Sequence, residues 1–338
     1  MITVVLGGFS AAGAYGAAPS THIPPINEDA AEQAKYTCPV APTAADKLAT
    51  AARLEPHTYS KNDLACAAEY RFALAQAAPD DRAAQLAALI ALDRYMDHVA
   101  TLRAFDLLTI DTAEFDARAD QANQMARALI PRAQAAWPDD PAVLALTAMT
   151  GIASASERIA ATRKAIVSLE RSIALDPGAL HGFASASVGR IYAELSPLYG
   201  GDTRKAIAHL QAARSVDPDN AMVLRLLASS YLEIGDTPAA MAALRALLDV
   251  PTQDAAQRQY VSDELRQGEG IASRLGEAGL SKQFAERRTR LLKENPELLV
   301  RNSITGIGHG GDNPVTGERQ YGSERGTLPG NAPSPKPR

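Results

Sequence analysis

The sequence has 338 residues, with 34 basic and 39 acidic side chains, a formal net charge of −5 and a pI near 5.7. This balance disfavours a nucleic-acid-binding protein, because such proteins gather basic side chains against phosphate groups. Alanine occupies 67 positions, whereas aromatic residues make up only 5% of the chain. Alanine favours helices, and few residues are of the types that build sheets, so the composition predicts an all-α protein.

The first eighteen residues, 1–18, contain no charged side chain and end in small residues. They resemble the apolar part and cleavage site of a secretory signal, although the basic region that normally comes first is missing. An exported, periplasmic protein is expected if this segment is a signal, and a cytoplasmic protein is expected if it is not. The segment is too short and too rich in glycine to predict a transmembrane span, and no later segment is a candidate.

Residues 19–45 contain five prolines and no apolar periodicity, which predicts an extended lead-in. Cys38 lies in this lead-in, Cys66 lies in the first helical segment, and the chain has no other cysteine. In an oxidising compartment a disulfide between them would tie the lead-in to the helices. The alternative is two unpaired, small hydrophobic side chains, and the sequence leaves both open. No cysteine or histidine cluster has metal-ligand spacing, so neither a metal nor a cofactor is expected.

Residues 46–298 are predicted to form one helical domain. Its first part, 45–76, predicts one or two helices interrupted near Pro56. The next part, 80–108, predicts an amphipathic helix with an acidic start at Asp80 and Asp81.

A pattern of equivalent positions then recurs through residues 110–252. Each copy has an alanine, a large apolar residue four positions later, a third core position three residues further on, and a proline after that. The spacing of four and three places three side chains on one helical face, and the proline ends the helix. The four copies are Ala126, Ile130, Ala133 and Pro138; Ala165, Leu169, Ser172 and Pro177; Ala206, Leu210, Ala213 and Pro218; and Ala240, Leu244, Leu247 and Pro251.

Each of these helices is preceded by another, so the pattern predicts helical hairpins in tandem. In the last unit, Gly235 is predicted to end the first helix, and Thr237 is predicted to cap the second, with Pro238 at its first position. Asp140 and Asn220 give similar start signals in other units.

These features resemble the tetratricopeptide repeat family, most clearly in the last unit, where Tyr231, Gly235, Ala240 and Leu244 match the family pattern. The unit before it departs from the pattern by five inserted residues, 196–200. The resemblance implies an α-solenoid of tandem hairpins with a concave groove. Extra helices are expected before it, and the polar helices 253–268 and 281–294 are expected to cap its end.

The inserted residues are part of a second resemblance. The run from Ser196 to Ala206, which reads SPLYGGDTRKA, is similar to a turn of TatT-like proteins, which are periplasmic repeat proteins associated with some solute transporters. That resemblance implies export and an apolar ligand channel. The turn also has structural reasons of its own, because Gly200 and Gly201 permit a tight turn with positive φ, and Asp202 can cap the following helix.

Candidate binding residues follow from both resemblances. The repeat family implies inner-face positions at Arg190, Glu194, Arg225 and Ser229. The two arginines could bind a carboxylate or a peptide terminus, or they could be solvated on an exposed helix face. The walls of a small-ligand or lipid channel are expected at Phe183, Leu198 and Tyr199.

The sequence contains no GxSxG, HExxH or phosphate-loop motif, so an enzyme is not expected. The segment 306–311 formally satisfies GxGxxG, but no strand precedes it. It lies in residues 299–338, a stretch rich in glycine and proline that predicts a flexible tail. The leading hypothesis is a non-catalytic, exported adaptor that presents a concave groove to a protein or peptide. The alternative is a TatT-like carrier of an apolar solute or lipid.

Overall fold

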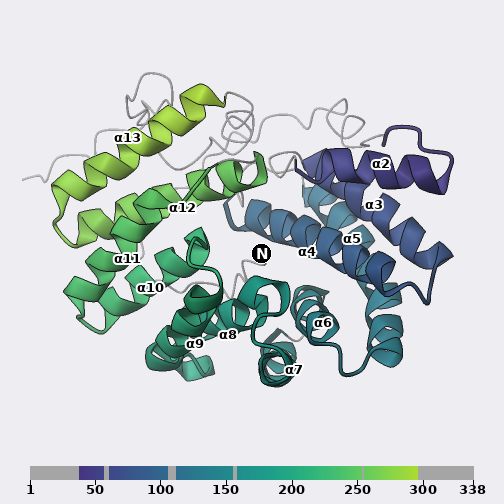
Figure 1. Ribbon diagram of the computed structural model, residues 1–338, viewed down its shortest axis with the longest axis horizontal. Helices are drawn as coiled ribbons and strands as arrows, with labels where there is room; N and C mark the ends of the chain where they lie inside the picture. The colour runs from purple at the N-terminus through teal and green to yellow at the C-terminus, as the bar shows by residue number, and fades with distance from the viewer. Residues whose placement is uncertain (1–37, 57–60, 106–111, 155–157, 253–254, 296–338) are drawn as a thin grey trace, which may run out of the picture.

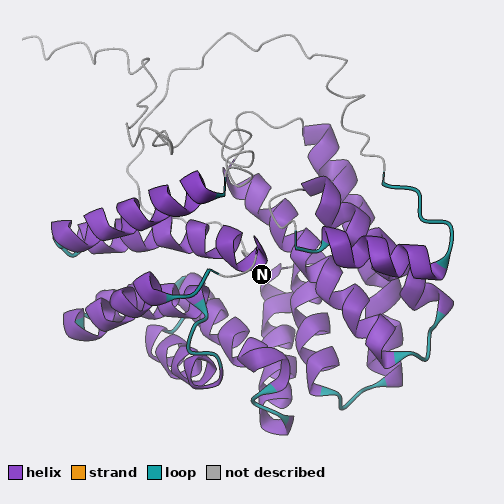
Figure 2. Cartoon of the chain, turned by 45° about the horizontal axis from the view of Figure 1, so that its top comes forward, coloured by secondary structure: helices purple, strands orange, loops and turns teal. Residues whose placement is uncertain are grey.

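The structure is a computed structural model that describes residues 38–56, 61–105, 112–154, 158–252 and 255–295. Within these ranges every regular element is a helix and none is a strand (Figure 2). The all-α prediction is therefore confirmed. The predictions for residues 1–18, for most of the lead-in, for the glycine motif at 306–311 and for the tail from 299 lie outside the described residues.

The described chain begins with four helices that precede or open the repeat array. They are α2 (Ala44–Leu54), α3 (Lys61–Ala77), α4 (Arg82–Phe105) and α5 (Thr112–Ala136). The prediction of one or two helices interrupted near Pro56 agrees with the separate helices α2 and α3. Figure 1 shows the chain then following an arc in which α4 and α5 lead into the later helices.

Four helical pairs complete the arc, and the two helices of each pair pack on one another. In Figure 1 the first helices of these pairs lie on the inner side of the arc and the second helices on the outer side. The pairs are α6 (Pro141–Ser154) with α7 (Arg158–Leu175), α8 (Phe183–Glu194) with α9 (Thr203–Val216), α10 (Ala221–Glu233) with α11 (Thr237–Asp249), and α12 (Ala255–Arg274) with α13 (Ala278–Glu294). Two short 3₁₀ helices, Ala179–Gly182 and Pro197–Tyr199, precede and follow α8.

The recurring sequence pattern falls on one equivalent helix in each unit. Its four copies lie on α5, α7, α9 and α11, and their core positions are buried, except that Ile130 is half-buried. Small side chains at these positions let neighbouring helices approach closely, and the large ones fill the space between pairs. The predicted array of helical hairpins, an α-solenoid, is confirmed.

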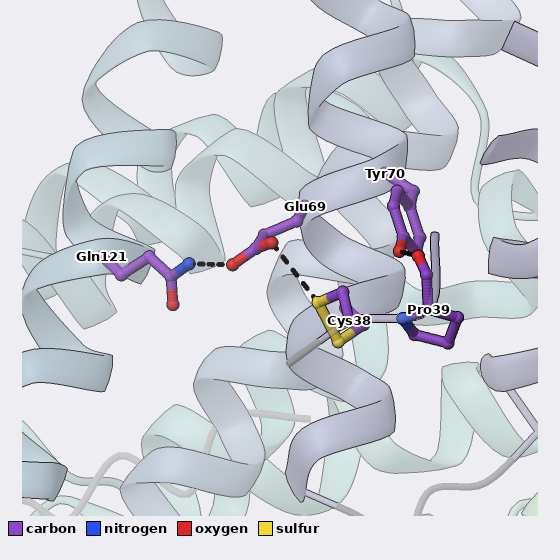
Figure 3. Close-up of a disulfide and its surroundings, with 6 residues drawn as sticks. Cys38, Pro39, Glu69, Tyr70 and Gln121 are labelled. Atoms are coloured by element: carbon purple, nitrogen blue, oxygen red, sulfur yellow. Dashed lines mark hydrogen bonds between the residues drawn. A yellow bond between two sulfur atoms is a disulfide. The ribbon is translucent and has the colours of Figure 1, made fainter. Parts of the chain in front are cut away.

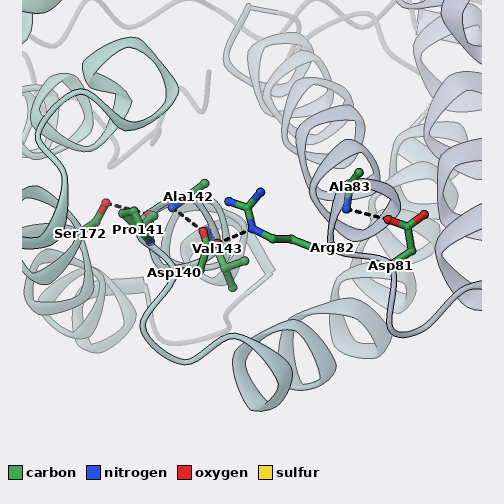
Figure 4. A network of polar contacts seen from close by, with 8 residues as sticks. All are labelled: Asp81, Arg82, Ala83, Asp140, Pro141, Ala142, Val143 and Ser172. Atoms are coloured by element: carbon green, nitrogen blue, oxygen red, sulfur yellow. Dashed lines mark hydrogen bonds and ion pairs between the residues drawn. The ribbon is translucent and has the colours of Figure 1, made fainter.

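Polar contacts at a helix start tie two units together (Figure 4). The carboxylate of Asp140 accepts hydrogen bonds from two backbone N–H groups in the first turn of α6, at 2.9 and 3.0 Å. It also pairs with Arg82 at the start of α4. Ser172, the third core position of the second copy, donates to the carbonyl of Pro141 at 2.7 Å. Asp140 therefore begins α6, as predicted, and also joins α6 to α4.

Other helix starts agree with the sequence, with one correction. Asp81 caps α4, and the side chain of Asn220 accepts from the N–H of Val223 at the start of α10. The cap of α11 is Asp236, which accepts from the N–H of Ala239 at 3.1 Å. The prediction of Thr237 as the cap, with Pro238 at the first helical position, was wrong by one residue, because the carboxylate of Asp236 reaches the N–H of Ala239 and Thr237 is already helical.

The array closes with α12 and α13. The predicted end of the first closing helix at residue 268 was too early, since α12 continues to Arg274. Gly268 does not end the helix but lets it approach its neighbours, because a Cβ there would lie 2.6 Å from a ring carbon of Phe284. On α13, Arg287 donates to the last carbonyls of α11, among them that of Leu247 at 3.1 Å. None of the described helices is long and apolar enough to cross a membrane.

Candidate binding face on the inner side of the array

Three successive inner helices bring charged side chains together. Arg190 and Glu194 stand one turn apart on α8, Arg225 lies on α10, and Glu264 lies on α12. We call these four residues the charged cluster. Arg190 Nε donates to Glu194 Oε2 at 3.2 Å, and Arg225 Nε donates to Glu264 Oε2 at 2.6 Å. The structure therefore joins Arg190 and Arg225, two predicted inner-face residues, to carboxylates.

The cluster is largely but not fully buried. The exposed fractions of the side chains are 5% for Arg190, 24% for Glu194, 20% for Arg225 and 8% for Glu264. Burial alone would lower the pKa of Arg225, but the charges of Glu264 and Glu194 outweigh it, so that its pKa lies above the usual value. Arg225 is therefore charged at every physiological pH, and Glu194 electrostatically links the two ion pairs.

The apolar core of the hairpins is formed by other residues than these four. The small and large apolar residues on the outer helices fill the interior of the hairpins. Buried ion pairs also contribute little net stability, because removing two charges from water costs about as much as their attraction returns. A charged cluster that crosses three repeats and is partly open to solvent is therefore a candidate for recognition.

Ser229 lies one turn beyond Arg225 on α10 and is half-buried. Its hydroxyl forms no hydrogen bond with any residue that the structure describes. It thus presents a donor and an acceptor beside the charged cluster, where the sequence had placed it.

Sequence reasoning missed Glu264. The repeat pattern ends near residue 252, and the following helices had been assigned only a capping role. A usable signal was present, since Glu264 follows Arg225 by 39 positions, the same interval that separates the first two copies of the pattern. The other two intervals are 41 and 34 residues, so projecting the inner face by one more repeat points to the stretch 259–266, which contains Glu264.

The residues expected to line an apolar channel are not brought together. Phe183 is half-buried at the start of α8, where its ring packs against the apolar core. Leu198 and Tyr199 lie beyond the other end of that helix, with exposed fractions of 92% and 51%. Because α8 has 12 residues, its two ends are about 18 Å apart.

The inserted turn has the expected cap but a different role for one glycine. Asp202 accepts from the N–H groups of Arg204 and Lys205, each at 3.0 Å, and so begins α9. Gly200 has a positive φ of 102°, but Gly201 does not share it, so the expectation of positive φ at both was wrong. Gly201 is needed for a different reason, because a Cβ there would lie 1.8 Å from the carbonyl oxygen of Leu195.

Two tyrosines of the repeat helices could be taken for binding residues, but both pack on the core. Tyr192 and Tyr231 are half-buried against the apolar cluster of the last three pairs. The ring of Tyr192 stacks on His209, with ring centres 6.0 Å apart. The hydroxyl of Tyr231 accepts from Gln211 at 2.6 Å. These contacts give both tyrosines a structural role.

At the opposite end of the array, Cys38 and Cys66 form a disulfide (Figure 3). It joins the lead-in to α3, where the hydroxyl of Tyr70 also donates to the carbonyl of Pro39. Glu69, the neighbour of Tyr70, accepts from Gln121 on α5. Of the two alternatives that the sequence left open, the structure contains the bonded one.

The fold and the inner face define an all-α helical-repeat protein. Residues 198–261, which include Arg225 and Ser229 of the candidate face, match a family model described as "Tetratricopeptide repeat". This match supports the resemblance to the tetratricopeptide repeat family that the sequence pattern predicted. The search of curated proteins found no match. In the described residues, no group of three or more acidic, histidine or cysteine side chains could hold a metal ion.

Proposed function

We propose that this protein is a non-catalytic adaptor that binds another protein along the inner side of its helical array. Tetratricopeptide repeats form modules for protein–protein interaction, and the matched segment contains the centre of the inner face. The observation that carries the proposal is the charged cluster on α8, α10 and α12. It spans three repeats, and it is partly open to solvent.

Site-specific photo-crosslinking tests the proposal in the cells that produce the protein. A photoreactive phenylalanine analogue replaces Ser229 on the inner face, and a matched control replaces Lys282, whose side chain is 76% exposed on α13 at the outer side. Both variants must first unfold at the wild-type temperature. We expect a discrete protein adduct from position 229 and none from position 282. Adducts only from position 282, or the same adducts from both, would contradict a specific inner-face partner.

The proposal includes an exported, periplasmic location. The Cys38–Cys66 disulfide supports it, because disulfides persist in oxidising compartments and are rare where thiols are kept reduced. Alkylation of intact cells with a thiol reagent that adds mass tests this point. We expect no mass shift unless the protein is first reduced, whereas two modified cysteines before reduction would place the protein in a reducing compartment.

A TatT-like carrier of an apolar solute or lipid is the alternative hypothesis. It is the weaker one, because Phe183 packs in the core while Leu198 and Tyr199 lie exposed about one helix length away. Native mass spectrometry of protein purified without added ligand separates the two hypotheses. A co-purified lipid or solute would favour the carrier, and a clean protein mass would favour the adaptor.

A further inference from the structure

The turn between α8 and α9 exposes its two largest apolar side chains to solvent. Leu198 and Tyr199 have exposed fractions of 92% and 51%, and neither belongs to an apolar cluster in the described part of the chain. Both lie within the five residues, 196–200, by which this unit departs from the repeat pattern. The packing of the hairpins therefore does not account for these two side chains.

The chain holds this exposed tip through hydrogen bonds of its own backbone. The N–H groups of Tyr199 and Gly201 both donate to the carbonyl of Ser196, at 2.9 and 3.1 Å. The N–H of Gly200 donates to the carbonyl of Pro197 at 3.2 Å. Backbone donors that are paired in this way can enter an apolar phase, whereas unpaired donors would lose their hydrogen bonds to water. The tip thus combines exposed apolar side chains with paired backbone donors.

Apolar side chains are also exposed at the turns of the two neighbouring helical pairs. Ile159, the second residue of α7, is 38% exposed, and Ile234, at the end of α10, is 48% exposed. Because successive units follow the same path and pack side by side, the turns from first to second helices lie along one edge of the array. We call Ile159, Leu198, Tyr199 and Ile234 the apolar edge.

Two cations lie directly behind the tip, in the first turn of α9. Arg204 and Lys205 are exposed, and neither forms an ion pair with any residue that the structure describes. The one carboxylate in the run 196–206 is that of Asp202, which is occupied in capping α9. Cations at the start of a helix oppose its dipole, so they do not help α9 to form. With two cations and one carboxylate, the run has a net charge of +1, in contrast to the acidic chain as a whole.

We propose that the apolar edge docks on the surface of a phospholipid bilayer that contains anionic headgroups. Leu198 inserts among the acyl chains, and Tyr199 lies at the level of the headgroups. Arg204 and Lys205 then bind headgroup phosphates, and the isoleucines of the neighbouring turns extend the contact. The order of these groups, from the tip to the start of α9, matches the order of apolar, amphipathic and anionic layers in a bilayer.

Docking through this edge goes beyond the proposed adaptor function and does not depend on it. The residues of the edge lie at the turns between helices, whereas the charged cluster lies on the inner helices. A protein that is docked in this way keeps its inner face free for a partner.

Vesicle sedimentation tests the docking with two kinds of vesicle, pure phosphatidylcholine and an equal mixture of phosphatidylcholine and phosphatidylglycerol. We expect binding to the mixed vesicles to be about tenfold stronger and to weaken in salt. Leu198→Ser should lower the partition constant about tenfold, because a leucine no longer leaves water. Leu175→Ser is the matched control, since Leu175 is 49% exposed at the opposite end of α7, and it should leave binding unchanged.

A substitution at the start of α9 tests the charge contribution. Arg204→Gln should lower the partition constant on mixed vesicles about fivefold, and the difference from wild type should disappear in about 500 mM NaCl. Arg214→Gln, in the last turn of the same helix, is the control and should have no effect. Melting curves establish that all the variants are folded.

Insertion of the tip also has an optical signature. The chain has one tryptophan, Trp137, which packs against the core. Tyr199→Trp places a second indole at the tip. We expect its emission to shift to shorter wavelength when mixed vesicles are added, because the ring leaves water, whereas the emission of the wild type stays unchanged.

Four outcomes would overturn the inference. The first is folded protein that binds neither kind of vesicle. The second is binding that Leu198→Ser does not weaken, or that Leu175→Ser weakens equally, since the contact would then lie elsewhere. The third is self-association without vesicles that Leu198→Ser abolishes, which would make the edge an interface between copies.

The fourth is a discrete protein adduct from a photoreactive residue at position 199 without vesicle binding, which would make the edge a protein-binding surface. Crosslinking at position 229 is measured on the same preparations. A failure of docking with that crosslink intact would refute only the membrane inference, and loss of the crosslink with docking intact would refute only the adaptor.

Discussion

The two ends of the array hold their helices together by different means. From α8 to α13, one continuous apolar cluster runs through three helical pairs. At the start of the described chain, α2 packs mainly on α3 over a small cluster of alanines with Leu54 and Tyr70. There the disulfide and the ion pair between Arg71 and Glu55 add to the contacts that hold this end together.

This difference shows which helices the repeated apolar packing can hold together without other contacts. In the repeats, each unit buries its apolar face on two neighbours, so side-chain shape alone specifies the packing. The terminal helix α2 has a neighbour on one side only, and its contact with α3 is made mostly by small side chains. A covalent bond and individual polar contacts then replace the missing apolar area. Substitutions in four places test this comparison.

The largest effect is expected from Gly201→Val in the turn between α8 and α9. The new side chain would collide with the backbone of Leu195, because a Cβ at Gly201 lies 1.8 Å from that carbonyl oxygen. We expect a loss of about 4 kcal/mol in the free energy of unfolding, measured by urea denaturation. Tyr199→Ala in the same turn is the control and should change stability by less than about 0.5 kcal/mol. Wild-type stability of the valine variant would show that the turn moves freely.

The next largest loss of stability is expected at the N-terminal end of the described chain. Replacing Cys38 and Cys66 by serine opens a loop that spans 28 positions, with an expected loss of about 3 to 4 kcal/mol. Hydrogen exchange should show the earliest loss of protection in α2, since that helix depends most on the bond. Reductant should lower the stability of the wild type to that of the double variant and leave the double variant unchanged. Equal exchange of α2 with and without the disulfide would remove the contrast between the two ends.

Two glycines of α12 allow a matched pair of alanine substitutions with opposite expected effects on stability. A Cβ at Gly268 would lie 2.6 Å from Phe284, whereas a Cβ at Gly270 would meet nothing within 4 Å. We expect Gly268→Ala to cost about 2 kcal/mol by forcing α12 and α13 apart. Gly270→Ala should stabilise the protein by about 0.5 to 1 kcal/mol through helix propensity. Thermal melts of both variants measure the difference, and equal effects would mean that packing does not decide this region.

The smallest effect is expected for Asp140→Asn, at the junction of α4 and α6. Burial raises the pKa of Asp140, but hydrogen bonds from Arg82 and from the backbone of α6 outweigh it and hold the pKa below its ordinary value of 3.8. Because Arg82 is half exposed, and asparagine also caps helices, we expect a loss of only about 0.5 kcal/mol.

The lowered pKa of Asp140 also determines how the effect of this substitution on stability changes with pH. A lowered folded-state pKa means that the stabilisation is complete above about pH 4 and is lost as the pH falls further. The stabilities of wild type and Asp140→Asn should therefore converge in acid. Asp219→Asn, at an exposed position, is the control with no such convergence. A difference that persists at pH 2 would show that the carboxylate charge is not the cause.

Sequence reasoning succeeded where one local rule decides the outcome. The spacing of the alanine positions placed them on one face of equivalent helices, and Asp140, Asn220 and Asp202 were assigned correctly as caps. It failed where two adjacent residues could serve, as with Asp236 and Thr237, since the choice depends on which side chain reaches the free N–H groups. It also placed the end of the helix 253–268 too early, since α12 continues past Gly268, where the glycine permits close packing.

The sequence by itself determined that the described part of the chain is helical and where the repeating helices between residues 110 and 252 lie. These properties follow from periodicity and helix signals, which act over fewer than about ten residues. Only the tertiary structure decided that Arg225 pairs with Glu264, that Phe183 lies far from Leu198, and that Gly201 is needed for contact with Leu195. Such outcomes depend on how whole helices approach one another, and that geometry is the sum of many contacts across the array.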